Sequence, residues 1–393
     1  MRQFLKMNFT EIKNIEDQFQ VETYAKMNIA VERGSGAWVW TSEGEKYLDL
    51  YGGHAVCATG HSHPHVVKAI QQQADKVLFY SNLVYSEIRA KAAEKLVSVA
   101  PDSLSTAFFC NSGTEANENA MRMARMAMGR EKVITFTGGF HGRTADSISA
   151  TFLGKYRAIG RPNVPGHVAA DFGDIDSVKA VADRETAAIM LEPIQSMAGV
   201  REASPVFFKQ LRELCDELGI ILIFDEVQTG IGRTGNWFFS GSDLADSVEP
   251  DIITLAKSLG SGVPVGACLV SEKVAKNIKV NDLGTTFGGG MLAMAAVLAT
   301  LEAIENDTMI ANAGYVEKYL RDSLGGISNV VALHGKGCLL GIEFDGPVGP
   351  IHAKLLANNI ITGTSSDPKV LRLLPPLCVE LDKINMLVEV LSR

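Results

Sequence analysis

The feature that most constrains the fold of this chain is an unbroken apolar run at residues 220–224, Ile-Ile-Leu-Ile-Phe. A strand that is apolar at every position needs cover on both faces, as a central strand of a parallel sheet has. Similar short apolar runs occur before and after it, and helix-like stretches such as residues 205–218 separate them. This alternation is typical of parallel strands joined by crossover helices, so the sequence predicts an α/β fold.

The predicted elements divide the chain into three parts. Residues 1–45 form an N-terminal segment with a hairpin around residues 38–40, and residues 46–282 form a large domain. From residue 283 a long Ala, Leu and Met helix and then shorter elements indicate a C-terminal domain at residues 283–393. The strands of the large domain are predicted at residues 106–110, 132–136, 188–191, 220–224, 252–255 and 266–270.

Composition and charge narrow the classes of partner. The chain has 37 Lys and Arg against 45 Asp and Glu, a formal net charge of −8, and lacks a basic cluster that would follow nucleic-acid phosphates. Its six cysteines are dispersed without a CxxC pair, which argues against a disulfide framework. We see neither a signal-peptide pattern nor an apolar run long enough to span a bilayer. We therefore expect a small-molecule partner, no nucleic acid, no membrane and a cytoplasmic location.

Reactive side chains follow the predicted strands at the points where the strands end. In an open parallel sheet such groups gather outside the carboxyl ends of the strands. We therefore expect one site assembled from several strand ends. The segments are residues 111–114, 138–143, Glu192, 225–228 and Lys257.

Ser112, Gly113 and Thr114 form the first of these groups. At the start of a helix they offer backbone N–H groups, the positive end of the helix dipole and two hydroxyls, which together suit a phosphate. Ser and Thr are also common helix N-caps. Taken alone, this turn is therefore explained at least as well by helix capping as by phosphate binding.

Asp225 and Lys257 form the chemically sharper pair. A carboxylate at the end of the most apolar strand caps the next helix or meets a pyridine nitrogen, which it keeps protonated so that the ring withdraws electrons. Lys257, between an apolar strand and a Gly/Ser loop, is either a surface lysine or the holder of a Schiff base. Combined with the Ser-Gly-Thr turn, the pair favours a pyridoxal-phosphate enzyme that moves an amino group.

Several motifs resemble the class III, or ω-amino-acid, aminotransferases of pyridoxal-phosphate fold type I, in the family's order and over nearly the whole chain. The resemblance implies a mostly parallel seven-stranded sheet flanked by helices, with a smaller α+β domain built from the N- and C-terminal segments. The motifs are residues 44–50 (GEKYLDL), 60–64 (GHSHP), 111–117 (NSGTEAN), 140–144 (FHGRT), 225–230 (DEVQTG), 233–235 (RTG), the loop around Lys257 and 285–289 (TTFGG).

The resemblance also implies roles around the cofactor. Lys257 would hold pyridoxal 5'-phosphate as a Schiff base and shuttle a proton, and Asp225 would pair with the pyridinium nitrogen. Gln228 would hydrogen-bond the phenolic oxygen and Phe140 would stack on the ring, while Glu192 matches a carboxylate near the cofactor.

The phosphate would be held by Ser112, Gly113 and Thr114, and by Thr286 from a second subunit. The resemblance therefore implies a homodimer whose site is completed across the interface.

Residues 80–85 (YSNLVY) and the compact length resemble the acylornithine branch of the family. In that branch Arg143 would bind the α-carboxylate of the acylated donor and Arg372 that of 2-oxoglutarate or glutamate, because a forked guanidinium suits a carboxylate. Tyr24 matches a position that contacts substrate in relatives. The implied reaction is ping-pong transfer of the distal amine of N-acetylornithine to 2-oxoglutarate, which gives the semialdehyde and glutamate.

One departure leaves the acyl group open. Relatives read EPIQGEGG where residues 192–199 read EPIQSMAG, so Met197 replaces a Glu that would pair with the arginine matching Arg372. Either another carboxylate screens Arg372, or the donor carries a second carboxylate, as succinylornithine does.

Other functions remain as alternatives. A 4-aminobutyrate or other ω-amine aminotransferase uses the same machinery, and an aminomutase or decarboxylating relative would keep Lys257 and Asp225 without a second carboxylate clamp. A ligand-binding sensor is disfavoured by the intact Lys257. A metal site at His61, His63 and His65 is also disfavoured, because a helix that begins at Pro64 would splay the rings, so we expect no metal.

Overall fold

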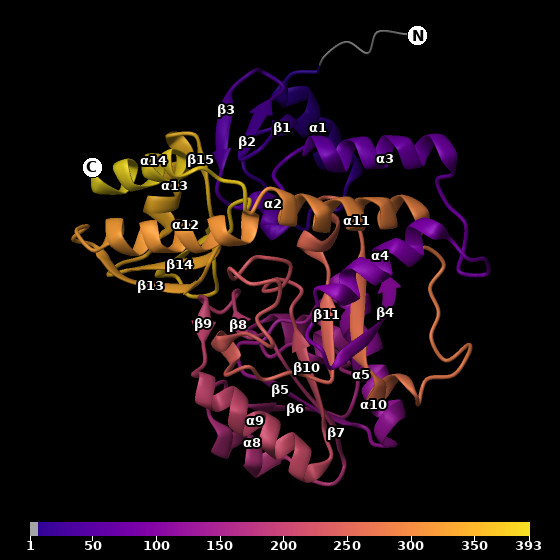
Figure 1. Ribbon diagram of the computed structural model, residues 1–393. Coiled ribbons are helices and arrows are strands. Elements are labelled where there is room, and N and C mark those ends of the chain that lie inside the picture. Colours follow the sequence, from indigo (N-terminus) through magenta and orange to yellow (C-terminus); the bar gives the residue numbers. More distant parts are fainter. Residues whose placement is uncertain (1–6) are drawn as a thin grey trace.

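The computed structural model describes residues 7–393 and contains one large sheet of seven strands in the order β4–β12–β11–β10–β7–β5–β6 (Figure 1). All neighbours pair in parallel except β12, which runs antiparallel to both β11 and β4. The α/β fold with a mostly parallel seven-stranded sheet is therefore confirmed. The strands are β4 Leu104–Cys110, β5 Lys132–Phe136, β6 His167–Ala170, β7 Thr186–Leu191, β10 Ile221–Asp225, β11 Ile252–Leu255 and β12 Gly266–Ser271.

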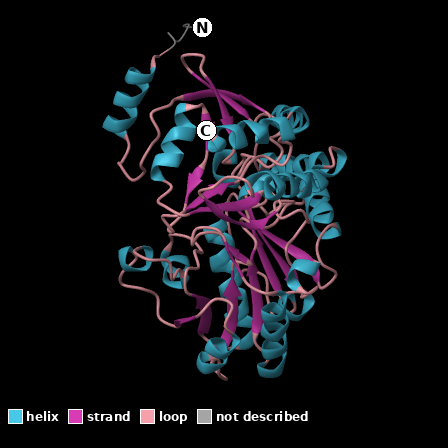
Figure 2. Cartoon of the chain, turned by 90° about the vertical axis from the view of Figure 1, so that its left-hand side faces the viewer, coloured by secondary structure: helices cyan, strands magenta, loops and turns pink. Residues whose placement is uncertain are grey.

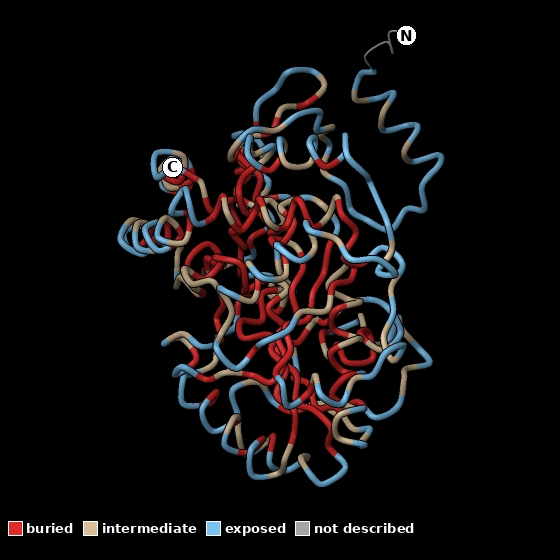
Figure 3. The backbone as a smooth tube through the Cα atoms, turned by 45° about the vertical axis from the view of Figure 1, so that its right-hand side comes forward, coloured by how far each residue is buried: buried red, intermediate tan, exposed pale blue. Residues whose placement is uncertain are grey.

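The central strand β10 is buried on both faces, as its apolar run predicts. Ile221 and Ile223 pack into an apolar cluster with α5 (Gly113–Met128), whereas Leu222 and Phe224 pack into the main cluster with α9 (Pro205–Leu218). Figure 3 shows this buried interior running through the centre of the molecule. Both faces are apolar up to the strand end, where Asp225 begins the functional site.

Two features of the sheet differ from the sequence prediction. The strand at Gly266–Ser271 is antiparallel, because residues 256–265 before it contain only the short 3-10 helix η2 (Lys257–Gly260), and a parallel neighbour needs a crossover of a dozen or more residues. The strand β6 was not predicted, because its four residues, His-Val-Ala-Ala, carry no distinctive pattern.

Segments from both ends of the chain build a smaller α+β region beside the large sheet (Figures 1 and 2). The predicted hairpin forms β2 and β3, and β3 pairs in parallel with β15 from the C-terminal part. The two sheets here are β1 Val31–Ser35, β2 Trp38–Thr41, β3 Lys46–Asp49 and β15 Ile360–Ile361; and β13 Val330–Lys336, β14 Leu339–Phe344, β17 Val370–Leu373 and β16 Gly363–Thr364. A separate two-stranded sheet, β8 Ile194–Gln195 with β9 Arg201–Glu202, comes from the middle of the chain.

Helices cover the sheets and join the two regions. The predicted helix from Met291 is α11, which contacts α3, α4 and η2. No helix within residues 7–393 is long and apolar enough to cross a membrane. Besides α5, α9 and η2, the helices of the described chain are α1 Phe9–Phe19, α2 Gly52–Ala55, α3 Pro64–Lys76, α4 Glu87–Ser98, α6 Ala145–Ala150, α7 Tyr156–Ile159, α8 Ile175–Val181, η1 Asp243–Ala245, α10 Glu272–Ala275, α11 Met291–Asn306, α12 Met309–Leu324, α13 Gly349–Ala357 and α14 Leu381–Ser392.

The division at residues 45 and 282 stays a proposal. Its first limit falls in the turn between β2 and β3, which pair with each other, and its second falls before α11.

Candidate active site

A cavity of about 440 Å³ opens at the carboxyl ends of the parallel strands, a size typical of small-molecule sites. It draws residues from the ends of β4, β5, β7, β10 and β11, as the strand-end argument predicts. The predicted site residues in its wall are Ser112, Gly113, Thr114, Phe140, Arg143, Glu192, Asp225, Gln228 and Lys257.

The turn after β4 forms the start of α5. Ser112 is the N-cap, and its Oγ accepts a hydrogen bond from Glu115 N at 3.3 Å. Glu115 in turn accepts from Asn111 N at 2.5 Å and from Asn111 Nδ2 at 3.0 Å. The first N–H groups of a helix lack partners inside it, so this turn is a helix cap and also suits a phosphate.

Asp225 lies at the end of β10 and is 4% exposed. Its Oδ2 accepts a hydrogen bond from Asn117 Nδ2 at 2.8 Å and lies 2.8 Å from His141 Nδ1, while Oδ1 accepts from Val227 N at 3.1 Å. Asn117 is oriented by Thr254, whose hydroxyl donates to Asn117 Oδ1 at 2.6 Å. These partners satisfy a buried carboxylate and fix its direction in the cavity wall.

Lys257 opens η2 in a left-handed backbone conformation, with φ of 41°. Burial lowers the pKa of its ammonium, although the nearby carboxylates Asp225 and Glu192 oppose the shift. Within residues 7–393 no hydrogen bond or ion pair engages its Nζ. A lysine with a lowered pKa and a free amine is suited to attack a carbonyl carbon.

Glu192 follows β7 and is held against the backbone of the next wall segment. Its Oε1 accepts a hydrogen bond from Phe140 N at 2.8 Å. Burial raises the pKa of Glu192 to about 7, and the charge of Asp225 adds to this effect while His141 and Lys257 oppose it. Glu192 thus fixes the backbone of Phe140, whose ring makes an edge contact with Tyr156 at 5.5 Å between centroids.

Gln228 lines this cavity, and its buried Oε1 has no hydrogen-bond partner within residues 7–393. Such groups cost free energy when they stay unpaired, so they mark places where a ligand supplies a partner. Pyridoxal phosphate brings a phosphate, a ring nitrogen and a phenolic oxygen. The Ser112 turn, Asp225 and Gln228 match these three groups, so the residues present fit this cofactor.

Arg143 lines the cavity and is exposed. Its guanidinium lies 4.9 Å from the ring centroid of Tyr156. No carboxylate of residues 7–393 pairs with it. Arg143 is therefore free to bind a substrate carboxylate beside Lys257.

Arg372 lies on β17 and, at 2% exposure, is buried rather than part of the cavity wall. Its Nε donates to Thr364 O at 2.7 Å, Nη1 to Ser196 Oγ at 3.1 Å and Nη2 to the Tyr51 hydroxyl at 2.7 Å. Burial lowers the pKa of the guanidinium. No carboxylate in the described part of the chain forms an ion pair with it, but the charge of Glu192 opposes the effect of burial on its pKa, so both options left by Met197 remain.

Besides Arg372, two further predicted residues do not line this cavity. Thr286 lines a different surface cavity, together with residues 81–86 and 280–285. Tyr24 is 69% exposed and lies beside α1. The predicted phosphate contact of Thr286 would come from a second chain. The predicted substrate contact of Tyr24 stays a prediction.

The sequence reasoning missed the turn at residues 51–55. Residues 52–55 all have left-handed backbone angles, with φ between 56° and 70°, which strains the non-glycine members His54 and Ala55. The Asp49 carboxylate accepts hydrogen bonds at 2.9 Å from three successive backbone N–H groups, residues 51–53, and lies 2.8 Å from His61 Nε2. The Gly-Gly pair after an aspartate was the available signal.

This turn places His54 in the cavity wall and Tyr51 against Arg372. Burial, together with the positive charges of Lys257, Arg372 and Arg143, lowers the pKa of His54 to about 4. Three nearby basic side chains therefore favour the neutral form of the His54 imidazole.

His63, in the GHSHP motif, and His65, just after it, pair separately with acidic residues. His63 Nε2 lies 3.0 Å from Asp307 and His65 Nε2 lies 2.7 Å from Glu302. Within residues 7–393, no group of three or more His, Cys, Asp or Glu side chains is arranged to hold a metal ion.

Comparison with known sequences gives a consistent set of relatives. The family model for aminotransferase class-III matches residues 19–393. The acetylornithine aminotransferase of Archaeoglobus fulgidus is 40% identical over 380 residues, 96% of this chain and 98% of that protein. The acetylornithine aminotransferase of Methanopyrus kandleri is 40% identical over 378 residues, 95% of this chain and 96% of that protein.

Solved structures agree with this result. The ornithine aminotransferase of Toxoplasma gondii superposes with a TM-score of 0.91 at 27% identity and covers 98% of this chain and 94% of its own. A second structure of that enzyme has pyridoxal phosphate at partial occupancy in the active site. The acetylornithine aminotransferase of Elizabethkingia anophelis gives a TM-score of 0.85 at 26% identity and covers 98% of both chains.

Proposed function

Because the chain belongs to the class-III aminotransferases, we propose that it moves the distal amino group of an N-acylated ornithine, first of all N-acetylornithine, to 2-oxoglutarate. The protein is a pyridoxal-phosphate-dependent aminotransferase of the acetylornithine aminotransferase type. The observation that carries the substrate proposal is that Arg143, which has no carboxylate partner, shares one cavity with Lys257.

The proposed residue roles follow from the geometry of the cavity. Bound pyridoxal phosphate supplies a carbonyl that takes up the amine and a protonated ring that withdraws electrons from the substrate carbon. The Ser112 turn holds the phosphate, Asp225 keeps the ring nitrogen protonated, and Gln228 meets the phenolic oxygen. Phe140 packs on the ring. Lys257 Nζ would be the nucleophile that holds the cofactor and, as a free amine, would carry the proton that moves at the substrate carbon.

Substrate orientation is assigned to the two arginines. Arg143 binds the α-carboxylate of the donor, so the distal amine of the extended side chain reaches Lys257. Arg372 binds a carboxylate of 2-oxoglutarate. The Tyr51 hydroxyl, which accepts a hydrogen bond from the same guanidinium, then lies beside this carboxylate.

A homodimer is part of the proposal, with Thr286 reaching the phosphate of the partner's site. Supporting it, large apolar side chains cluster in the exposed segments around Thr286: Leu83 is 90% exposed, Val280 91% and Phe287 65%. We also propose a cytoplasmic location, supported by the six free cysteines. The mass in solution tests the dimer, and a monomer with full activity would contradict it.

A donor with a second carboxylate, such as N-succinylornithine, is the second candidate. The observation in its favour is Arg372, a buried guanidinium whose hydrogen-bond partners in the described chain are all neutral. A buried guanidinium without a direct ion pair is costly, and a dicarboxylate donor would supply a carboxylate to both Arg143 and Arg372.

The test is a steady-state panel of donors with 2-oxoglutarate as acceptor: N-acetylornithine, N-succinylornithine, ornithine, N-acetyllysine and 4-aminobutyrate. The proposal expects an acylated ornithine to have the highest kcat/KM, with glutamate as product. A preference for ornithine or 4-aminobutyrate would contradict it. A preference for N-succinylornithine would select the second candidate.

A further inference from the structure

The segment that carries Arg143 leads into a helix that does not cap itself. Thr144 is the N-cap of α6 (Ala145–Ala150), but its side chain makes no cap hydrogen bond to this helix. Ser147 is buried in the first turn. Buried N–H groups at a helix start need partners, so the cap must come from another element.

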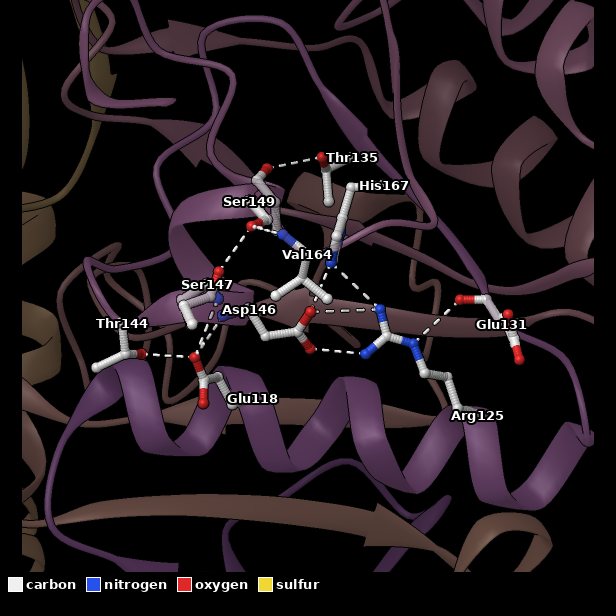
Figure 4. Close-up of polar contacts among 12 residues, drawn as sticks. Glu118, Arg125, Glu131, Thr135, Thr144, Asp146, Ser147, Ser149, Val164 and His167 are labelled. Atoms are coloured by element: carbon white, nitrogen blue, oxygen red, sulfur yellow. Dashed lines mark hydrogen bonds and ion pairs between the residues drawn. The ribbon is translucent and has the colours of Figure 1, made fainter. Parts of the chain in front are cut away.

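Glu118, on α5, supplies this cap (Figure 4). Its Oε1 accepts hydrogen bonds from Asp146 N at 2.8 Å, Ser147 N at 3.2 Å and the Thr144 hydroxyl at 2.6 Å. A carboxylate at a helix N-terminus is favoured by the helix dipole, and hydrogen bonds to an ionised acceptor are stronger than neutral ones.

The same threonine also touches the phosphate turn. Thr144 Oγ1 lies 2.5 Å from Thr114 Oγ1. The backbone at Gly142, just before Arg143, passes close to Thr114. A Cβ on Gly142, whose φ is 133°, would lie 2.3 Å from Thr114 Oγ1. Thr114 and Glu118 are four residues apart and so lie on one face of α5. This face therefore contacts the segment on both sides of Arg143.

The side chain of Asp146, in the first turn of α6, is held by a separate network. Asp146 Oδ2 accepts a hydrogen bond from Arg125 Nη1 at 2.6 Å, and Asp146 Oδ1 lies 2.6 Å from His167 Nε2 (Figure 4). Asp146, Arg125 and His167 do not line the cavity. This network anchors the helix without touching the phosphate turn, so it provides a matched control.

The Arg143 side chain has little support of its own. Its described contact is with the ring of Tyr156, at 4.9 Å, and its backbone position sets where the guanidinium lies. We propose that Glu118 is a positioning residue that fixes Arg143 relative to the phosphate turn, and so determines how tightly the enzyme holds the donor carboxylate. The inference rests on the proposed role of Arg143 in donor binding.

The experiment compares N-acetylornithine with N-acetylputrescine, which has the same distal amine but no carboxylate. Glu118→Ala should raise the KM for N-acetylornithine about tenfold or more and leave the KM for N-acetylputrescine nearly unchanged. Glu118→Gln keeps an acceptor oxygen and should restore part of the loss. Hydrogen exchange of the amides at residues 143–150, measured with and without cofactor, should become faster in Glu118→Ala.

A double-mutant cycle separates the two proposals. If Glu118 acts through Arg143, the effect of Glu118→Ala on the KM for N-acetylornithine should vanish in an Arg143→Met background, because the two changes remove one interaction. Persistence of the full effect in that background would overturn the role of Glu118. An unchanged KM in Arg143→Met alone would instead contradict the role of Arg143 in the proposed function.

Asp146→Asn is the control for simple loss of stability. It should lower the melting temperature while the ratio of the two KM values stays that of the wild type. If Asp146→Asn shifted this ratio as much as Glu118→Ala does, the effect would be general loosening of α6 and the positioning proposal would be wrong.

Discussion

The Nη2 of Arg372 donates a hydrogen bond to the Tyr51 hydroxyl at 2.7 Å. A residue of the turn at residues 51–55 thus holds the buried arginine of β17. The Asp49 carboxylate pins this turn through three backbone N–H groups. Residues 321 positions apart thus meet at one guanidinium. The position of the proposed 2-oxoglutarate clamp therefore depends on both ends of the chain.

Tyr51→Phe should weaken this clamp. The substitution removes the hydroxyl and leaves a buried guanidinium N–H without its partner, so the KM for 2-oxoglutarate should rise about tenfold, or about 1.4 kcal/mol. The KM for N-acetylornithine, which we assign to Arg143, should change much less. Steady-state kinetics with each substrate varied in turn would measure both, and an unchanged KM for 2-oxoglutarate would contradict the assignment of Arg372.

Met197→Glu should change donor preference. Met197 lines the cavity and is adjacent to Ser196, whose hydroxyl accepts from Arg372 at 3.1 Å, so a carboxylate here would reach the arginine. The ratio of kcat/KM for N-succinylornithine to that for N-acetylornithine should fall about tenfold, the effect of roughly 1.4 kcal/mol. Met197→Leu is the uncharged control. The same ratio in both variants would show that the charge at this position does not set the acyl preference.

Lys257→Ala should abolish turnover, because the variant has no amine to hold the cofactor or to move a proton. Reduction of the holoenzyme with borohydride should leave a stable cofactor adduct on Lys257 in the wild type, visible by peptide mass spectrometry, and none in the variant. Lys276→Ala, at an exposed lysine beyond α10, is the control and should retain wild-type rates. Full activity in Lys257→Ala would refute the mechanism.

The His61–Asp49 pair should make stability fall at alkaline pH. Burial disfavours the charged ring, but hydrogen bonds with Asp49 and Cys57 outweigh it and raise the pKa of His61 to about 10. The raised pKa means that the pair contributes its full stability below about pH 6.5, the unfolded value, and loses it as the pH rises through about 10.

Urea unfolding at pH 6, 8 and 10 would measure this effect. His61→Asn should cost about 1.5–3 kcal/mol at pH 6, the range for hydrogen bonds to charged groups, and progressively less toward pH 10. An equal cost at all three pH values would contradict a protonated His61.

Much of the fold and site could be predicted because the decisive signals are local. The apolar run before Asp225 indicates a covered strand, and each strand end delivers its polar residue to the same edge of the sheet. Lys257, Asp225 and the Ser112 turn were found in this way, and the structure places them in one cavity.

The remaining features depend on contacts between distant segments. The sequence shows Glu118 only as a polar residue on a helix, and its role as a cap for α6 appears when α5 and the Arg143 segment pack together. The strain at His54 is tolerable because Asp49 and His61 fix the turn. Likewise, the direction of β12 follows from the short connection after Lys257, which a strand pattern alone does not reveal.

Single-turnover absorbance of the cofactor would show whether the enzyme transaminates an acylated ornithine. N-acetylornithine or N-succinylornithine alone should convert the holoenzyme completely to the amine form of the cofactor, and 2-oxoglutarate added afterwards should restore the original spectrum with release of glutamate. If neither acylated ornithine changed the spectrum, or if 2-oxoglutarate failed to restore it, the account would be contradicted.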